Sequence, residues 1–290
     1  MNLISEFLRS MRPKQWIKNL LILTVPFASK ISDIAIWRDI FIGLLVFSLL
    51  TSSVYIFNDI YDYDSDKHHP VKKFRGIASG RISRRQSWFL FSLNLSLSII
   101  GTILFVPDIT YLIFTYLGVN LLYTLGFKTL PFIEIVAVAS GFVIRVLVGA
   151  RISATEPSSW ILICSLSGAM FVVIGKRFAE KKNSLAMNST NHRKVLSSYT
   201  EDGLKTNLTV AASVFAGGYV QWASQLNPAH ENRVWSLISS LGVLVFLMSY
   251  IETIYRGKGE QPEKDLMHGF QQIMIIVLTL LSMVLAVYSR

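Results

Sequence analysis

Apolar residues in this chain gather in long runs that are separated by shorter polar stretches. A run of about 20 apolar residues is long enough for a helix to cross a bilayer, and the runs do not alternate with period two as barrel strands would. Pro26, Lys30 and Asp33 interrupt the first run, so its N-terminal part is also compatible with an amphipathic helix at the membrane surface. The pattern predicts nine spanning helices, at residues 20–36, 40–57, 87–106, 109–126, 131–150, 158–175, 207–226, 234–255 and 270–289.

The composition agrees with a membrane protein. Of the 290 residues, 52% are hydrophobic and 16% are charged, and the mean hydropathy is +0.46. These values exclude an ordinary soluble enzyme, and a single cysteine, Cys164, excludes an internal disulfide. We therefore expect an all-α integral membrane protein with one transmembrane helical domain over residues 1–290.

The basic residues are distributed unevenly around the predicted helices. If the spans are placed as above, 22 of the 28 Lys and Arg residues fall in the N-terminus or in the connections after spans two, four, six and eight. The positive-inside rule makes that side cytoplasmic, with the N-terminus inside and the C-terminus outside. Contact with the lipid bilayer therefore explains the net charge of +10, and no nucleic-acid partner is expected.

The most informative polar residues close the second span. Asn58, Asp59, Asp62 and Asp66 are spaced by three and four residues, so they share one face if the helix continues. Carboxylates held close together repel one another unless a cation lies between them, and hard oxygen ligands favour Mg²⁺. Asp59, Asp62 and Asp66 are thus candidate metal ligands and, with Asn58, candidate catalytic residues. The alternative is a solvated helix end.

A basic stretch follows at once. His69, Lys72, Lys73 and Arg75 are candidate substrate-binding residues, because a metal can neutralise some oxygens of a polyphosphate while cations hold the others. Ordinary inside-positive charge explains the same residues, and Arg81, Arg84 and Arg85 are left undecided between the two explanations.

These motifs resemble the UbiA superfamily of intramembrane transferases, whose members close the second helix with Asn-Asp-x-x-Asp-x-x-x-Asp. Residues 58–66 here read NDIYDYDSD. Further blocks resemble a branch that transfers phosphoribose to a lipid phosphate, although Gly76 stands where that branch has proline. The resemblance implies a UbiA-like bundle of about nine helices, multi-pass in the bacterial inner (plasma) membrane. The blocks are MRPKQWIKN (11–19), DKHHPVKKFRGIASG (66–80), IVAVASGFVIRVLVG (135–149) and GKRFAE (175–180).

The superfamily usually carries a second aspartate cluster after the sixth helix, and this chain does not. The corresponding segment offers Lys176 and Arg177 among several basic residues, with only scattered acids. One acidic and one basic half-site imply a metal-bound diphosphate facing other phosphates that cations alone hold. We expect the segments 58–86 and 176–206 to form cytoplasmic active-site loops together.

Other residues enter the candidate substrate-binding set through their position and through the resemblance. Lys128 matches a lysine that grips a diphosphate in the superfamily, and Tyr123 is a candidate wall of the pocket. Arg145 lies in an apolar span, where a charge by default marks a pocket, and Glu134 is a possible but distant partner. The remaining candidates, at the cytoplasmic mouth, are Lys14, Gln15, Lys18 and Asn19; an interfacial anchor explains the two lysines almost as well.

The sequence thus predicts a Mg²⁺-dependent enzyme that moves 5-phosphoribose from 5-phosphoribosyl-1-diphosphate to a polyprenyl phosphate, for cell-envelope glycan precursors. One alternative is a prenyltransferase that uses an isoprenyl diphosphate with an aromatic or lipid acceptor, against which the missing second cluster argues. Another is a transporter or flippase for a phosphorylated lipid, against which the location of both clusters on one membrane face argues. Formation of a homo-oligomer is left open.

Overall fold

The computed structural model describes residues 3–69, 71–186, 194–226, 233–260 and 270–288, and these residues contain helices and no strand. Seven of the described helical segments are long and apolar enough to cross a membrane. The predicted all-α membrane fold is confirmed, and the seven segments coincide with predicted spans two to six, eight and nine. They are Ile34–Tyr61, Arg84–Phe105, Pro107–Leu125, Ile133–Ile152, Ser159–Ser184, Arg233–Tyr255 and Phe270–Tyr288.

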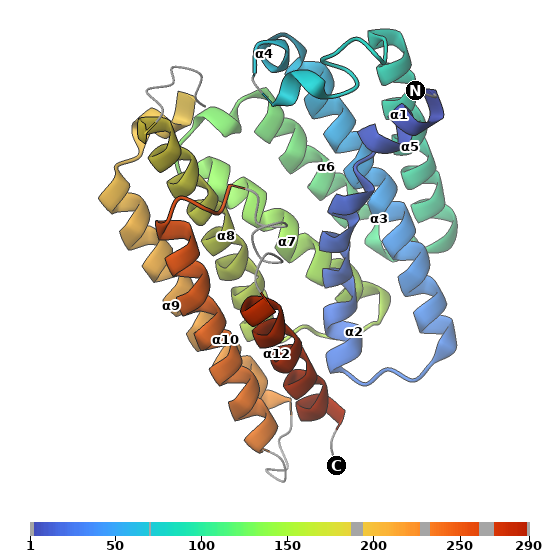
Figure 1. Ribbon diagram of the computed structural model, residues 1–290. Coiled ribbons are helices and arrows are strands. Elements are labelled where there is room, and N and C mark those ends of the chain that lie inside the picture. The colour runs from blue at the N-terminus through green and yellow to red at the C-terminus, as the bar shows by residue number, and fades with distance from the viewer. Residues whose placement is uncertain (1–2, 70, 187–193, 227–232, 261–269, 289–290) are drawn as a thin grey trace. The chain divides into compact units, whose positions relative to one another are not determined.

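The chain divides into two compact units, which are described separately (Figure 1). Unit 1 comprises Met1–Phe127 and Ile144–Glu156, and unit 2 comprises Lys128–Val143 and Pro157–Arg290. Helix α7, Ile133–Ile152, contributes residues to both.

Unit 1 is built around α3, which contacts α1, η1, α5 and α6. Its core contains Phe47, Leu50 and Tyr116, and the ring centroids of Phe47 and Tyr116 lie 4.8 Å apart. Polar caps fix where the helices begin: the Asp33 side chain accepts from Ala35 N, and Ser83 forms a capping box with Gln86. The elements are α1 (Leu3–Ser10), η1 (Pro13–Leu23), α2 (Thr24–Ala28), α3 (Ile34–Tyr61), α4 (Tyr63–Lys67), η2 (Lys72–Phe74), α5 (Arg84–Phe105), η3 (Pro107–Ile109) and α6 (Thr110–Leu125).

The first predicted span has an unexpected form. Residues 13–23 make a 3₁₀ helix of 11 residues, far longer than the usual three or four, followed by the short α2. Three residues per turn place every third side chain on one face. Trp16 Nε1 donates to Ser52 Oγ and Asn19 Nδ2 donates to Ser48 Oγ, so this face meets α3. Lys14, Ile17 and Leu20, which are also spaced by three and so share another face of the 3₁₀ helix, are exposed.

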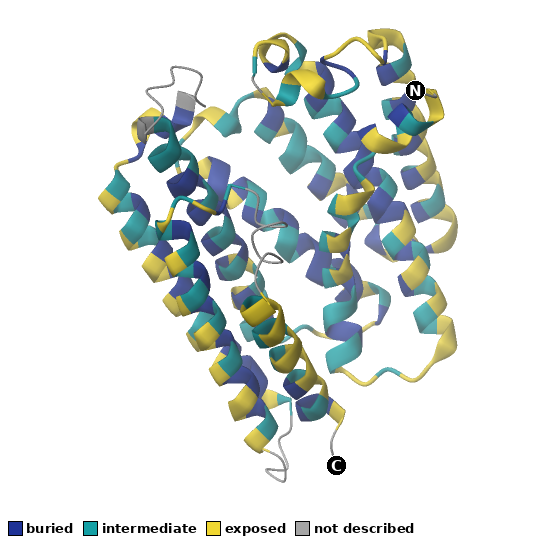
Figure 2. Cartoon of the chain, viewed as in Figure 1, coloured by how far each residue is buried: buried dark blue, intermediate teal, exposed yellow. Residues whose placement is uncertain are grey.

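Unit 2 packs α8 against α9, and α10 against α8, α9 and α12. The predicted seventh span, 207–226, falls within α9, which is long enough to cross a membrane but is not among the seven apolar segments. Figure 2 shows α12 exposed along much of its length, as expected for a helix whose apolar side chains contact lipid. The elements are η4 (Phe127–Thr129, shared between the two units), α8 (Ser159–Ala186), η5 (Lys194–Ser198), α9 (Glu201–Gln225), α10 (Arg233–Tyr255) and α12 (Phe270–Tyr288).

Candidate active site

The acidic motif lies where α3 ends. Asp59 is in the last turn of α3, the helix stops at Tyr61, and Asp62 is its C-cap residue with φ −86° and ψ 7°. The short helix α4 then carries Asp66. The predicted common face requires one continuous helix, and the break at Asp62 removes it. Asp59 and Asp66 are buried, whereas Asp62 is half-buried.

Arg75 joins the two buried carboxylates. Its Nη1 donates to Asp59 Oδ1 at 2.9 Å and to Asp66 Oδ2 at 2.7 Å. Lys72 Nζ lies 3.6 Å from Asp66 Oδ1, and Arg12 Nη2 donates to Asp59 Oδ1 at 2.6 Å. The two acidic side chains therefore form ion pairs with three basic side chains. We call these five side chains the carboxylate cluster.

Arg12 is the functional candidate that sequence reasoning missed. Its backbone is left-handed, with φ 54° and ψ 58°, immediately before Pro13. Non-glycine residues rarely adopt this conformation, and they keep it only where the surroundings hold it. Here the guanidinium lies 4.8 Å from the centroid of the Tyr55 ring and contacts Asp59. The available signal was its place in the block MRPKQWIKN, although its position near the N-terminus is equally typical of inside-positive charge.

Burial differs sharply between the acids and the bases of the carboxylate cluster. The side chains of Asp59 and Asp66 are 7% and 2% exposed, whereas those of Arg12, Lys72 and Arg75 are 26%, 29% and 32% exposed. A buried carboxylate needs a charged or hydrogen-bonding partner, and the bases supply it. An anion that approaches from solvent therefore meets cations before it meets the acids.

The donor set of the carboxylate cluster fits Mg²⁺. Oxygens of Asp59 and Asp66 converge on a single nitrogen of Arg75, so a cation fits between them. Mg²⁺ is commonly held by one or two carboxylates together with phosphate oxygens of a substrate. Among the described residues no group of three or more His, Cys, Asp or Glu side chains lies together. The structure thus brings together two of the three predicted ligands, and Asp62 stays a prediction.

Two structural features adjoin the carboxylate cluster: a hydrogen bond made by Asn58 and the close packing around Gly76. Asn58, predicted to be catalytic, accepts a hydrogen bond from Thr124 Oγ1 and so ties α3 to α6. Gly76 follows Arg75 directly, and a Cβ atom there would lie 3.0 Å from Oε2 of the buried Glu6. Arg81 Nε lies 3.1 Å from the same oxygen. Glu6 and Ile82 thus leave little room for a side chain at position 76, and Arg81 is placed as one partner of Glu6, beside Arg9.

Arg145 lies within unit 1 rather than beside Glu134. Its Nε donates to Asn19 Oδ1 at 2.9 Å and its Nη2 to Tyr116 OH at 3.2 Å. Asn19 is 1% exposed and belongs to this internal network, and its predicted place at the cytoplasmic mouth stays a prediction. A Cβ at Gly149 would lie 1.8 Å from Ile22 O, which shows how closely η1 approaches α7 here.

Arg177 also differs from its predicted role. Its side chain is 3% exposed, and it donates to both oxygens of Glu134, at 2.5 and 2.7 Å, and to Glu180 Oε2 at 2.7 Å. Tyr199 OH accepts from Phe132 N and donates to Glu134. Burial raises the pKa of the Tyr199 phenol, and the Glu134 carboxylate adds to the rise. The structure thus places Arg177 in a buried ion-pair network, and its predicted contact with a substrate phosphate stays a prediction.

The other predicted residues have varied settings. His69 Nδ1 accepts from the backbone N–H groups of Val71 and Lys72, each at 3.2 Å, so it shapes the turn before η2. Lys73 Nζ lies 5.2 Å from the centroid of the Phe74 ring. Lys14 is exposed, and the half-buried members of the set are Gln15, Lys18, Tyr123, Lys128 and Lys176.

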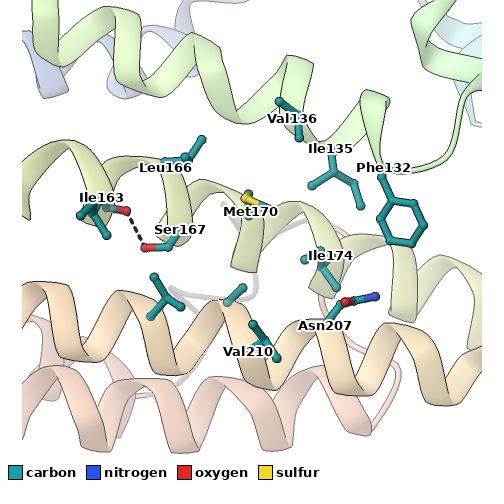
Figure 3. Close-up of a pocket in the computed structure, with 12 residues that line it drawn as sticks. Phe132, Ile135, Val136, Ile163, Leu166, Ser167, Met170, Ile174, Asn207 and Val210 are labelled. Carbon is teal, nitrogen blue, oxygen red and sulfur yellow. Dashed lines mark hydrogen bonds between the residues drawn. The ribbon is translucent and has the colours of Figure 1, made fainter.

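Unit 2 contains an apolar cavity of about 450 Å³ between α7, α8 and α9. Figure 3 shows Phe132, Ile174 and Asn207 toward one end, and Ile163 and Leu166 toward the other. Asn207 and Ser167 are the polar residues of the lining, and the Ser167 hydroxyl donates to Ile163 O. The cavity therefore suits a hydrocarbon segment.

Helices of membrane-spanning length, several with large apolar side chains exposed, define a multi-pass helical membrane protein. Residues 20–271 match the UbiA prenyltransferase family. The chain belongs to that family. The resemblance stated from the motifs is thereby confirmed.

Curated relatives cover nearly the whole chain. Decaprenyl-phosphate phosphoribosyltransferase of Corynebacterium glutamicum is 32% identical over 272 residues, covering 91% of this chain and 81% of that protein. The protein of the same name from Mycolicibacterium smegmatis is 30% identical over 275 residues, covering 91% and 86%. That of Mycobacterium tuberculosis is 29% identical over 270 residues, covering 90% and 87%.

Solved structures share the fold. A UbiA homolog from Archaeoglobus fulgidus bound to GPP and Mg²⁺ superposes with a TM-score of 0.72 at 18% identity, covering 97% of this chain and 99% of that one. A UbiA homolog from Aeropyrum pernix K1 gives 0.65 at 11% identity, covering 98% and 99%. At these identities the likeness extends to the fold alone.

Proposed function

We propose that the protein transfers 5-phosphoribose from 5-phosphoribosyl-1-diphosphate to a polyprenyl phosphate and releases diphosphate. The observation that carries the proposal is the carboxylate cluster, in which two buried acids lie beneath three cations at the end of α3. Such an arrangement suits a polyanion that brings a divalent metal. The relatives named decaprenyl-phosphate phosphoribosyltransferase support the choice of substrates.

The bond changes require little proton chemistry. An oxygen of the acceptor phosphate forms a bond to C1 of the ribose, and the bond from C1 to the diphosphate oxygen breaks. The acceptor is already an anion, so it needs no general base, and the electron pair leaves with the diphosphate. Bound Mg²⁺ supplies electrostatic stabilisation of the charge that develops on the diphosphate.

Each part of the carboxylate cluster has a role in this proposal. Asp59 and Asp66 hold the metal, with Asp62 as the third predicted ligand. Arg12 and Lys72 lie at the more exposed level of the cluster, where they meet the phosphate oxygens first. Charge-assisted contacts of this kind are roughly twice as strong as neutral hydrogen bonds and orient the donor.

The acceptor is expected to use different surroundings. A polyprenyl chain is hydrocarbon, and the apolar cavity between α7, α8 and α9 is lined for such a segment. The phosphate end of the acceptor needs cations, and Lys128 and Lys176 of unit 2 remain candidates for that contact. The cavity and the two lysines together support a phosphorylated lipid as acceptor.

Orientation is part of the proposal. The basic excess predicts that the N-terminus and the segments 58–86 and 176–206 face the cytoplasm, with the protein in the bacterial plasma membrane. Residues 187–193 of the second segment lie outside the described residues. A cytoplasmic site suits a water-soluble sugar diphosphate as donor.

A transfer assay tests the function. Purified protein, Mg²⁺, polyprenyl phosphate and 5-phosphoribosyl-1-diphosphate labelled in the ribose are mixed, and the organic phase is counted. We expect label in the lipid and release of diphosphate. If label stays in water while an isoprenyl diphosphate is consumed with an aromatic or lipid acceptor, the prenyltransferase alternative is correct.

A further inference from the structure

The guanidinium of Arg75 occupies the position between the two buried acids. One nitrogen, Nη1, is the hydrogen-bond donor to both Asp59 and Asp66, at 2.9 and 2.7 Å. Asp59 and Asp66 would hold a metal ion through these same oxygens, and Nη1 of Arg75 fills the space between them. Arg75 and a metal ion therefore cannot occupy this position together.

The charges of the cluster lead to the same conclusion. Two carboxylates are already outnumbered by three cations, all within 3.6 Å of a carboxylate oxygen. Adding a divalent ion without removing a cation would place like charges beside one another in a site that is partly screened from water. Entry of the metal requires one cation to leave, or a polyanion to arrive with the metal.

Arg75 is the cation whose departure would open the position between the acids, because its Nη1 alone of the three contacts both of them. Arg12 is fixed by its left-handed backbone and by the Tyr55 ring below its guanidinium. Arg75 extends from the turn after η2, and its side chain is the most exposed of the three. Its guanidinium can therefore turn toward solvent while the two carboxylates keep their places on α3 and α4.

We propose that Arg75 is an internal counter-cation, which holds Asp59 and Asp66 together before the substrate binds and moves onto the diphosphate when the metal enters. This inference rests on the proposed function for the identity of the polyanion. Its consequence is that metal and diphosphate bind cooperatively. Each is bound weakly alone, because Arg75 blocks the metal and, while it is paired with the two acids, is not available to the diphosphate. Arg75 is thus a positioning residue for the metal site.

Mn²⁺ binding to the full-length protein tests this inference without catalysis. Free Mn²⁺ is followed by its paramagnetic resonance signal, with and without inorganic diphosphate, for the wild type and for Arg75→Gln. We expect Arg75→Gln to tighten Mn²⁺ binding in the absence of diphosphate by about fivefold or more, the lower end of typical coupling between sites. The enhancement of Mn²⁺ binding by diphosphate should shrink by a similar factor.

Matched variants keep the result interpretable. Arg84→Gln removes the same charge from a residue whose partner, Asp64, is itself exposed, and it should leave Mn²⁺ binding unchanged. Asp66→Asn should abolish binding in either background. Arg75→Lys keeps the charge without the planar fork, so its Mn²⁺ affinity should lie above that of the wild type and below that expected for Arg75→Gln. This variant serves as the test if Arg75→Gln fails to fold.

Two results would overturn the inference. One is weaker or unchanged Mn²⁺ binding in folded Arg75→Gln, which would make Arg75 a support of the metal site or a bystander. The other is absence of Mn²⁺ binding in every variant, with or without diphosphate. Failure of the proposed function is separate: if no ribose label reaches lipid but Arg75→Gln still tightens Mn²⁺ binding, the counter-cation role stands and the substrate assignment falls.

Discussion

Substitution of Glu134 is the most direct test of the buried ion pairs. Its side chain is fully buried and accepts two hydrogen bonds from Arg177, whose side chain is 3% exposed. Glu134→Gln keeps the shape but removes the negative charge. Arg177 then remains in the interior and keeps its contact with Glu180 Oε2 at 2.7 Å, and Glu180 is only half-buried.

The expected loss of folding stability follows from the burial of the Glu134–Arg177 ion pair. Removing one member of a buried ion pair typically destabilises a protein by about 3–5 kcal/mol, because the remaining charge is left uncompensated. The contact from Arg177 to Glu180 persists, so we expect about 3 kcal/mol, near the lower end. The control is Glu252→Gln, whose partner Arg256 lies four residues along the chain and is exposed, as Glu252 itself is. That pair should be worth only about 0.3–0.5 kcal/mol.

The assay uses the single cysteine. Cys164 is buried in α8, the helix that also carries Arg177, so a thiol-reactive dye reports unfolding of this part of unit 2 during heating in detergent. Glu134→Gln should lower the midpoint by about 6–12 °C and Glu252→Gln by about 2 °C or less, in keeping with about 2–4 °C per kcal/mol for large domains. Replacing both Glu134 and Arg177 by apolar residues of similar size should recover part of the loss.

A particular outcome would refute this reasoning. If Glu134→Gln and Glu252→Gln have equal midpoints, the buried pair does not stabilise unit 2. If Arg177→Gln instead leaves the midpoint unchanged and raises the KM for a phosphorylated substrate, Arg177 is a substrate contact, as the sequence predicts.

Three further changes test other parts of the molecule. Asp59→Asn should lower transfer by about 10²-fold or more, measured as ribose label in lipid, because an acid proposed to hold the metal is lost; wild-type rates at limiting Mg²⁺ would contradict this. Gly149→Ala should destabilise unit 1 by about 1–3 kcal/mol, since the added carbon has no room, while Gly217→Ala, with nothing within 4 Å, should not. Cysteines replacing Arg85 and Ser198 in a cysteine-free background should both be labelled from the cytoplasmic side only, and labelling from opposite sides would rule out a shared face.

The length of the apolar runs made much of the fold predictable from the sequence. Continuous apolar stretches predicted the seven segments that the structure contains, because crossing hydrocarbon demands internal backbone hydrogen bonding and hence helix. The acidic motif was located correctly at the end of α3. Its geometry was not, because the i, i+4 argument assumes an unbroken helix, and a break at Asp62 is a local backbone event with no distinct sequence signal.

Long-range partners lay beyond sequence reasoning. Arg12 contacts an acid 47 positions away, Arg145 contacts an amide 126 positions away, and Arg177 contacts an acid 43 positions away. Each contact depends on how separate helices pack, whereas residue spacing informs only on neighbours along one helix. The sequence could mark Arg145 and Arg177 as candidates but not Arg12, and it could not say whether each arginine was free for substrate or already paired.

The 3₁₀ helix η1 has a consequence for how the length of this segment can vary. Because each residue advances by a third of a turn, deleting one residue of η1 rotates everything beyond it by 120° and turns Asn19 away from Ser48 if the preceding anchor holds. Deleting three restores the face and shortens the segment by one turn of about 6 Å. Insertions and deletions in multiples of three should therefore be the best tolerated in this segment, whereas an α-helix needs seven residues to return to within about 20° of its face.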